Sequence, residues 1–70
     1  MSHKKHKVKL FTWFDGRLFT EEHFADSHEE AKALAYNRGP HSFKIYDAES
    51  GEIQHTEIID GSHPQVPDYA

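Results

Sequence analysis

An Asp-Gly pair at residues 15–16 separates two runs that are rich in bulky apolar residues, and it constrains the fold more than any other feature. Asp-Gly favours a two-residue type I′ turn, in which both central residues need a positive φ that Gly adopts at little steric cost. The turn also sets the register, so Phe14 pairs with Arg17 and the remaining pairs follow outward. We therefore predict a β-hairpin over residues 7–24.

Both faces of this hairpin carry bulky apolar side chains. Successive side chains of a strand point to opposite faces. One face would carry Phe11, Trp13 and Leu18 with Lys9, Thr20 and Glu22, and the other Val8, Leu10, Phe14 and Phe19 with Thr12, Arg17 and Glu21. A sheet with one solvated face alternates more cleanly than this. The sequence therefore leaves open which face a helix covers, and a register slip of one residue would exchange them.

A helix is predicted to follow, over about residues 28–37. Ser27 is a favourable N-cap, and Glu30 three residues later completes a capping box. Gly39 is suited to the position after the helix and Pro40 prevents its continuation. The inner stripe of the helix would consist of Ala31, Leu34 and Ala35.

Two further strands are expected at residues 42–47 and 52–59, joined by a turn at residues 48–51. The element order is then ββαββ. The predicted fold class is α+β, with a single helix packed on one face of a four-stranded antiparallel sheet in the order 2-1-3-4. We expect one domain over residues 7–60, between a flexible basic arm at residues 1–6 and a disordered tail at residues 61–70.

Size and charge limit the functions that such a chain can have. It has 70 residues and a formal net charge of −4. The absence of Cys excludes disulfides and thiolate metal sites. No apolar run is long enough to span a bilayer and no secretory signal is visible, so a cytoplasmic protein is the expectation. The first nine residues carry +4 and the rest −8, and an acidic body argues against a broad nucleic-acid-binding face.

The spare apolar face is the main functional clue. A helix on the opposite face would leave an exposed aromatic patch, which usually marks an interface, and Trp and Tyr are common anchors of interfaces. We therefore expect a small non-catalytic protein-interaction module that binds another protein or itself as a homodimer. The candidate interaction residues are Phe11, Trp13, Leu18 and Tyr46.

Single-stranded nucleic-acid binding is the alternative function. Aromatic sheet faces can stack bases, and the N-terminal arm supplies the candidate phosphate contacts Lys4, Lys5, Lys7 and Lys9. Four Lys residues release few counterions, and no RNP-like motif is present. A solubilising terminus is the simpler interpretation of this arm.

Neither a metal site nor catalysis is predicted. The seven His residues are dispersed, without an HExxH or other compact ligand pattern. No nucleophile motif or phosphate-binding glycine loop is present. We expect neither enzymatic activity nor a cofactor.

Overall fold

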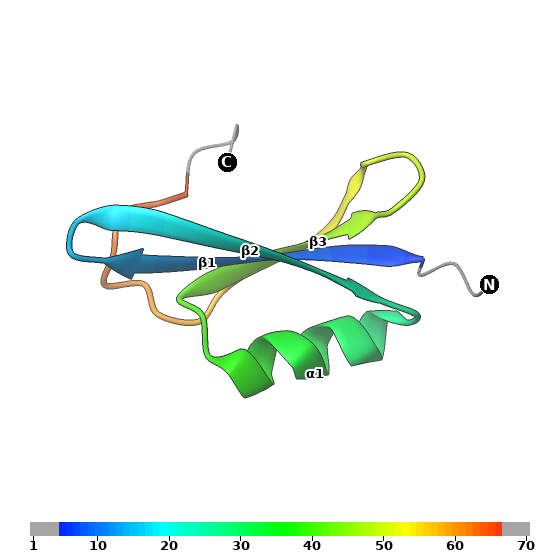
Figure 1. Cartoon of the computed structure of the whole chain (residues 1–70), viewed down its shortest axis with the longest axis horizontal. Helices are drawn as coiled ribbons and strands as arrows, with labels where there is room; N and C mark the ends of the chain where they lie inside the picture. The colour runs from blue at the N-terminus through cyan, green and yellow to red at the C-terminus, as the bar shows by residue number, and fades with distance from the viewer. Residues whose placement is uncertain (1–4, 67–70) are drawn as a thin grey trace.

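The computed structural model describes residues 5–66, and the predictions for residues 1–4 and 67–70 lie outside this range. The chain forms two long strands, one helix and two shorter strands (Figure 1). Their bounds are β1 His6–Phe14, β2 Arg17–Ala25, α1 His28–Arg38, β3 Ser42–Asp47 and β4 Ile53–Ile58. This is the predicted ββαββ order.

The sheet has the order β2-β1-β3-β4, and every neighbouring pair is antiparallel, which confirms the predicted topology. The hairpin register is also confirmed, from Phe14 opposite Arg17 outward. Asp15 and Gly16 have φ values of 53° and 73°, as a type I′ turn requires. The turn therefore fixes which side chains share a face.

The helix begins and ends where the capping residues predict. The Ser27 hydroxyl accepts a hydrogen bond from the Glu30 amide at 3.1 Å. Gly39 adopts the left-handed conformation with φ 68°, and its amide donates to the Ala35 carbonyl. These contacts satisfy backbone groups that the two helix termini would otherwise leave unpaired.

The helix covers one face of the sheet, and this settles the choice that the sequence left open. The core between α1 and the sheet consists of Val8, Leu10, Ala25, Ala31, Ala35, Phe43 and Ile45, with Leu34 packed against it. The two Ala residues let the helix approach large strand residues closely. The face that carries Phe11 is therefore the one opposite the helix, which we call the far face.

Two side-chain contacts fasten the helix to the edge strands. Arg38 in the last helical turn lies 2.8 Å from the Glu21 carboxylate on β2. The Tyr36 hydroxyl lies 2.7–2.8 Å from both carboxylate oxygens of Glu57 on β4. The helix is thus held at both edges of the sheet as well as through its core.

The second hairpin is less regular than the first. Strand β4 is one residue shorter at each end than predicted, and a register shift between Ile45 and Tyr46 interrupts its pairing with β3. Gly51, in the turn that joins β3 to β4, has φ 78° and is therefore in the left-handed region. Among residues 5–66, no helix has the length and apolar character needed to cross a membrane.

Candidate binding surface

The far face joins side chains from all four strands. The cross-strand pairs assign to it Lys7, Lys9, Phe11, Trp13, Leu18, Thr20, Glu22, Phe24, Ser42, Lys44, Tyr46, Ile53, Thr56 and Ile58. The end of the described chain also lies on this side, away from α1 (Figure 1). All four candidate interaction residues predicted from the sequence are therefore on one face.

The centre of the far face is closed. Phe11 is fully buried, and its cross-strand neighbours Thr20 and Ser42 are small. The Lys44 ammonium lies 5.6 Å from the centre of the Phe11 ring, and Lys44 is itself 8% exposed. Phe11 therefore forms a small second core, and it is not available to a partner in this conformation.

One flank of the far face is a cluster of charges around Tyr46. The Lys7 and Lys9 ammonium groups lie 5.9 and 5.6 Å from the centre of the Tyr46 ring. Both also lie near one Glu22 oxygen, at 3.3 and 3.8 Å. Burial, and secondly the negative charge of Glu22, raise the pKa of Tyr46, so its hydroxyl stays protonated at neutral pH.

The margins of the far face are apolar and exposed. Phe24 on β2 is 52% exposed, and Ile53 and Ile58 on β4 are 53% and 58% exposed. Ile53 and Ile58 line a groove of about 230 Å³, together with Ser42, Phe43, Lys44, Thr56, Gln65 and Val66. The surface that a partner can reach is therefore at the margins rather than at the aromatic centre.

A second exposed aromatic pair lies at the tip of the first hairpin, on the helix side. Phe14 and Phe19 are 70% and 52% exposed, and their ring centroids are 6.4 Å apart. Both point to the face that α1 covers, but they lie beyond the end of the helix. This pair belongs to a different surface from Phe24.

The sequence-predicted candidates thus differ in accessibility. Trp13, Leu18 and Tyr46 are half-buried, whereas Phe11 is closed off. The Trp13 indole N–H is buried without a hydrogen-bond partner in the described part of the chain. Such an unpaired group costs about 1–3 kcal/mol. Next to Trp13, the far face therefore contains a buried polar group without a hydrogen bond, which the helix-side core does not among the described residues.

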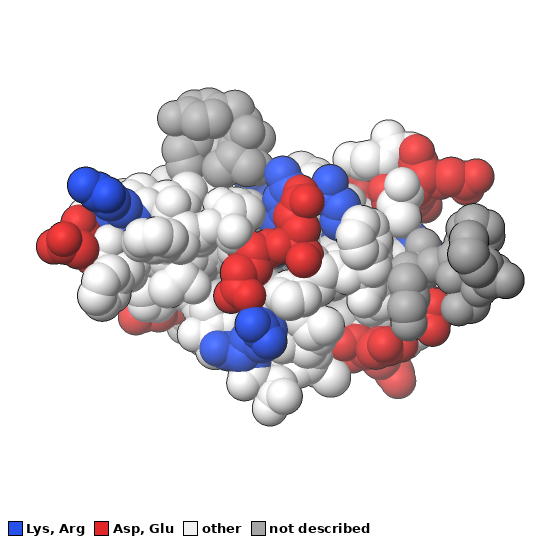
Figure 2. Space-filling view, viewed as in Figure 1, with Lys and Arg blue, Asp and Glu red and all other residues white. Residues whose placement is uncertain are grey.

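Among the candidate nucleic-acid residues that the structure describes, Lys7 and Lys9 lie beside an acidic side chain. Lys4 lies outside the described residues, and Lys7 and Lys9 share a carboxylate. In Figure 2, acidic and basic side chains touch across the middle of the molecule, so the charge on this side is mixed. Mixed charge attracts phosphates weakly.

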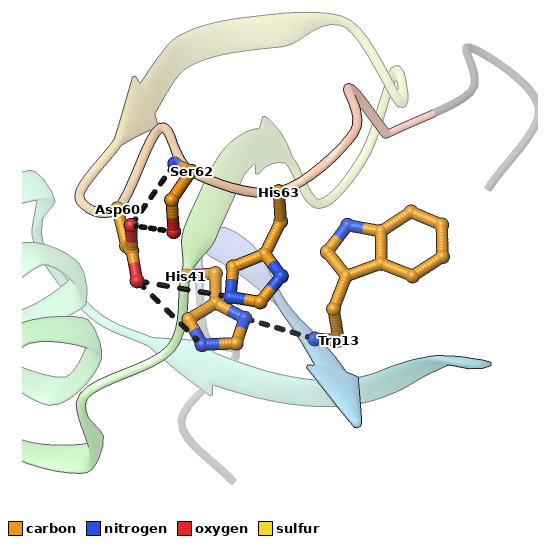
Figure 3. A network of polar contacts seen from close by, with 5 residues as sticks. All are labelled: Trp13, His41, Asp60, Ser62 and His63. Atoms are coloured by element: carbon orange, nitrogen blue, oxygen red, sulfur yellow. Dashed lines mark hydrogen bonds and ion pairs between the residues drawn. The ribbon is translucent and has the colours of Figure 1, made fainter. Parts of the chain in front are cut away.

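The loops at one end of the sheet bring together His41, Asp60 and His63 (Figure 3). The pairing of β1 with β3 ends at Phe11 and Ser42, so no residue of β3 lies opposite Trp13. The His41 side chain takes that place, because its Nδ1 accepts a hydrogen bond from the Trp13 amide at 2.9 Å. The two imidazoles stack with their centroids 4.0 Å apart.

Asp60 is oriented by its neighbour Ser62. Its Oδ1 accepts hydrogen bonds from the Ser62 amide at 3.0 Å and from the Ser62 hydroxyl at 2.6 Å. These bonds are the main reason that the pKa of Asp60 is lowered, so the carboxylate is ionised at neutral pH. The other oxygen, Oδ2, lies 4.0 Å from His41 Nε2 and 3.8 Å from His63 Nε2.

Sequence reasoning did not identify this cluster, because His41 and His63 are far apart in the chain. The predicted second hairpin nevertheless contained information that could have brought two of these residues together. His41 directly precedes β3 and Asp60 closely follows β4, so antiparallel pairing makes them neighbours. The Ile59 and Asp60 amides indeed donate to the His41 carbonyl, at 2.8 and 2.9 Å.

Comparison with known proteins adds no functional information. No protein-family model, no curated protein and no solved structure matches this chain.

Proposed function

We propose that this chain is a non-catalytic protein-interaction module that binds through the margins of the far face, with a homodimer as its simplest form. The carrying observation is that Phe24, Ile53 and Ile58 are each more than half exposed on the same face. Exposed apolar side chains gathered on one face are typical of interaction sites. Tyr46 lies between these margins, and Trp13 and Leu18 lie on the same face near the turn of the first hairpin. All three would contribute their accessible edges.

A groove beside β4 and the exposed apolar side chains at the margins favour a protein partner over a nucleic acid. Two of the predicted phosphate-binding ammonium groups already lie beside Glu22. The groove is bordered by apolar side chains from β4 and by Val66. Nucleic-acid binding remains the alternative, and it would be recognised by affinity for a single-stranded oligonucleotide that falls steeply with salt.

Two Phe residues of β2 provide a matched test. Phe24 and Phe19 are both 52% exposed but lie on opposite faces. Half-burying a Phe side chain contributes roughly 0.8–1.5 kcal/mol, and a symmetric dimer contains it twice. Phe24→Ser is therefore expected to weaken the dimer about 10- to 150-fold in Kd, measured by sedimentation equilibrium.

Phe19→Ser is the control, and it is expected to leave the dimer Kd within about twofold. Circular dichroism of both variants would show that the fold is kept. Equal effects of the two changes, or an effect of Phe19→Ser alone, would refute the far face as the contact surface.

A further inference from the structure

We propose that His41, Asp60 and His63 form a binding site for a divalent transition-metal ion of the zinc class, and that the bound ion fastens residues 60–63 to the end of the sheet beside Trp13. The three ligand atoms are His41 Nε2, His63 Nε2 and Asp60 Oδ2, which lie within 4.8 Å of one another. This site goes beyond the proposed interaction surface and does not depend on it.

The distances in the cluster leave room for one small ion. Both imidazoles lie 3.8–4.0 Å from the Asp60 oxygen, which is too long for direct hydrogen bonds. Zinc ligands about 2.0–2.1 Å from the ion are roughly 3.4 Å apart at the tetrahedral angle. Each imidazole nitrogen and the Asp60 oxygen therefore need to close by about half an ångström, which small side-chain rotations can supply.

The carboxylate is already oriented for this role. The two hydrogen bonds from Ser62 occupy Oδ1 and leave Oδ2 directed at the imidazoles (Figure 3). Hydrogen bonds of this kind commonly orient the ligands of metal sites. The backbone bonds from Ile59 and Asp60 to His41 hold the two halves of the site together.

The hydrogen bond from the Trp13 amide to His41 Nδ1 limits the affinity. While Nδ1 accepts this bond, a neutral His41 carries its proton on Nε2. Coordination through Nε2 requires that proton to leave, so His41 gives up or weakens its bond with Trp13. Metal binding and the hydrogen bond of the Trp13 amide are therefore coupled, and this coupling weakens the binding of the ion.

The ligand types select the class of ion. Two imidazole nitrogens and one carboxylate oxygen suit Zn²⁺, Ni²⁺ and Cu²⁺. Ca²⁺ and Mg²⁺ prefer six or more oxygen ligands, which this cluster does not offer. Solvent would supply the fourth ligand of a tetrahedral ion.

The single Trp of the chain gives the test a local reporter. Ni²⁺ bound at this cluster should quench Trp13 fluorescence with a saturable curve, and Zn²⁺ should compete with it. Zn²⁺ should also shift the Trp13 amide resonance and the imidazole nitrogens of His41 and His63 in NMR spectra. Absence of saturable quenching, or zinc-induced shifts confined to other His residues, would overturn the proposal.

Variants separate this site from the other His residues. His63→Ala and Asp60→Asn are each expected to raise the Ni²⁺ concentration at half-maximal quenching at least tenfold. His23→Ala is the matched control, because His23 also lies beside a carboxylate, at 3.3 Å from Glu21, but has no second imidazole in that pair. Quenching that survives His63→Ala and Asp60→Asn, or that His23→Ala reduces equally, would contradict the assignment.

Discussion

Truncation of Phe11 tests whether the far face contains a second core. Phe11 is fully buried on the side of the sheet away from α1, between the small residues Thr20 and Ser42 and beside Lys44. The ring fills the space that these neighbours leave. If this packing stabilises the fold, Phe11→Ala must destabilise the monomer, whereas loss of an exposed interface anchor would affect only association.

The expected cost is large for a domain of this size. Truncating a buried Phe to Ala typically costs about 3–5 kcal/mol. Seventy residues at about 0.05–0.15 kcal/mol each give a total stability of roughly 4–10 kcal/mol. Phe11→Ala is therefore expected to remove about 30% or more of the free energy of unfolding. Phe11→Leu keeps most of the packing and should cost about 1–1.5 kcal/mol.

Urea unfolding at a protein concentration low enough to keep the chain monomeric measures these costs. Circular dichroism follows the whole fold, and Trp13 fluorescence follows the far face. The control is Phe14→Ala, because Phe14 is 70% exposed at the hairpin tip and its loss should cost less than about 1 kcal/mol. A loss below 1 kcal/mol for Phe11→Ala, with weakened self-association, would refute the second core.

Two further predictions concern the helix. Ser27→Ala removes the acceptor of the Glu30 amide and should destabilise the fold by about 1 kcal/mol in urea unfolding, whereas Ser27→Asp should restore most of the loss. At His28, burial first, and then the nearby positive charges of Lys32, His55 and His6, lower the pKa below 6.5. The unfolded chain therefore binds the proton more readily, so the free energy of unfolding should fall as the pH is lowered from about 7.5 through 6.5 and the lower folded-state pKa. Unfolding curves should show a shallower dependence for His28→Gln over this window, and an unchanged dependence would contradict the assignment.

Local sequence signals predicted much of the fold. Asp15-Gly16 set the turn and with it the register of the long hairpin, and Ser27 and Gly39 marked the helix ends. Each of these residues acts through its own backbone conformation or a hydrogen bond to a near neighbour. Such signals do not depend on the rest of the chain, so they can be interpreted without a structure.

The choice of face and the polar cluster could not be predicted in the same way. Two Ala residues on α1 could have packed on either apolar face, and the choice depends on Phe43 and Ile45 of β3 completing the core beside Val8 and Leu10. The burial of Phe11 depends on Lys44 from another strand. The pairing of His41 with His63 needs the chain segments at both ends of the β3–β4 hairpin, so it follows only from the three-dimensional arrangement.

The solution mass of the unmodified chain tests the central claim most directly. Light scattering across a wide concentration range, repeated at low and high salt, would follow self-association through the far face. The account predicts a mass that rises from monomer to dimer with increasing concentration and that persists at high salt, because the contact is mainly apolar. A monomeric mass at the highest concentrations would contradict the homodimer.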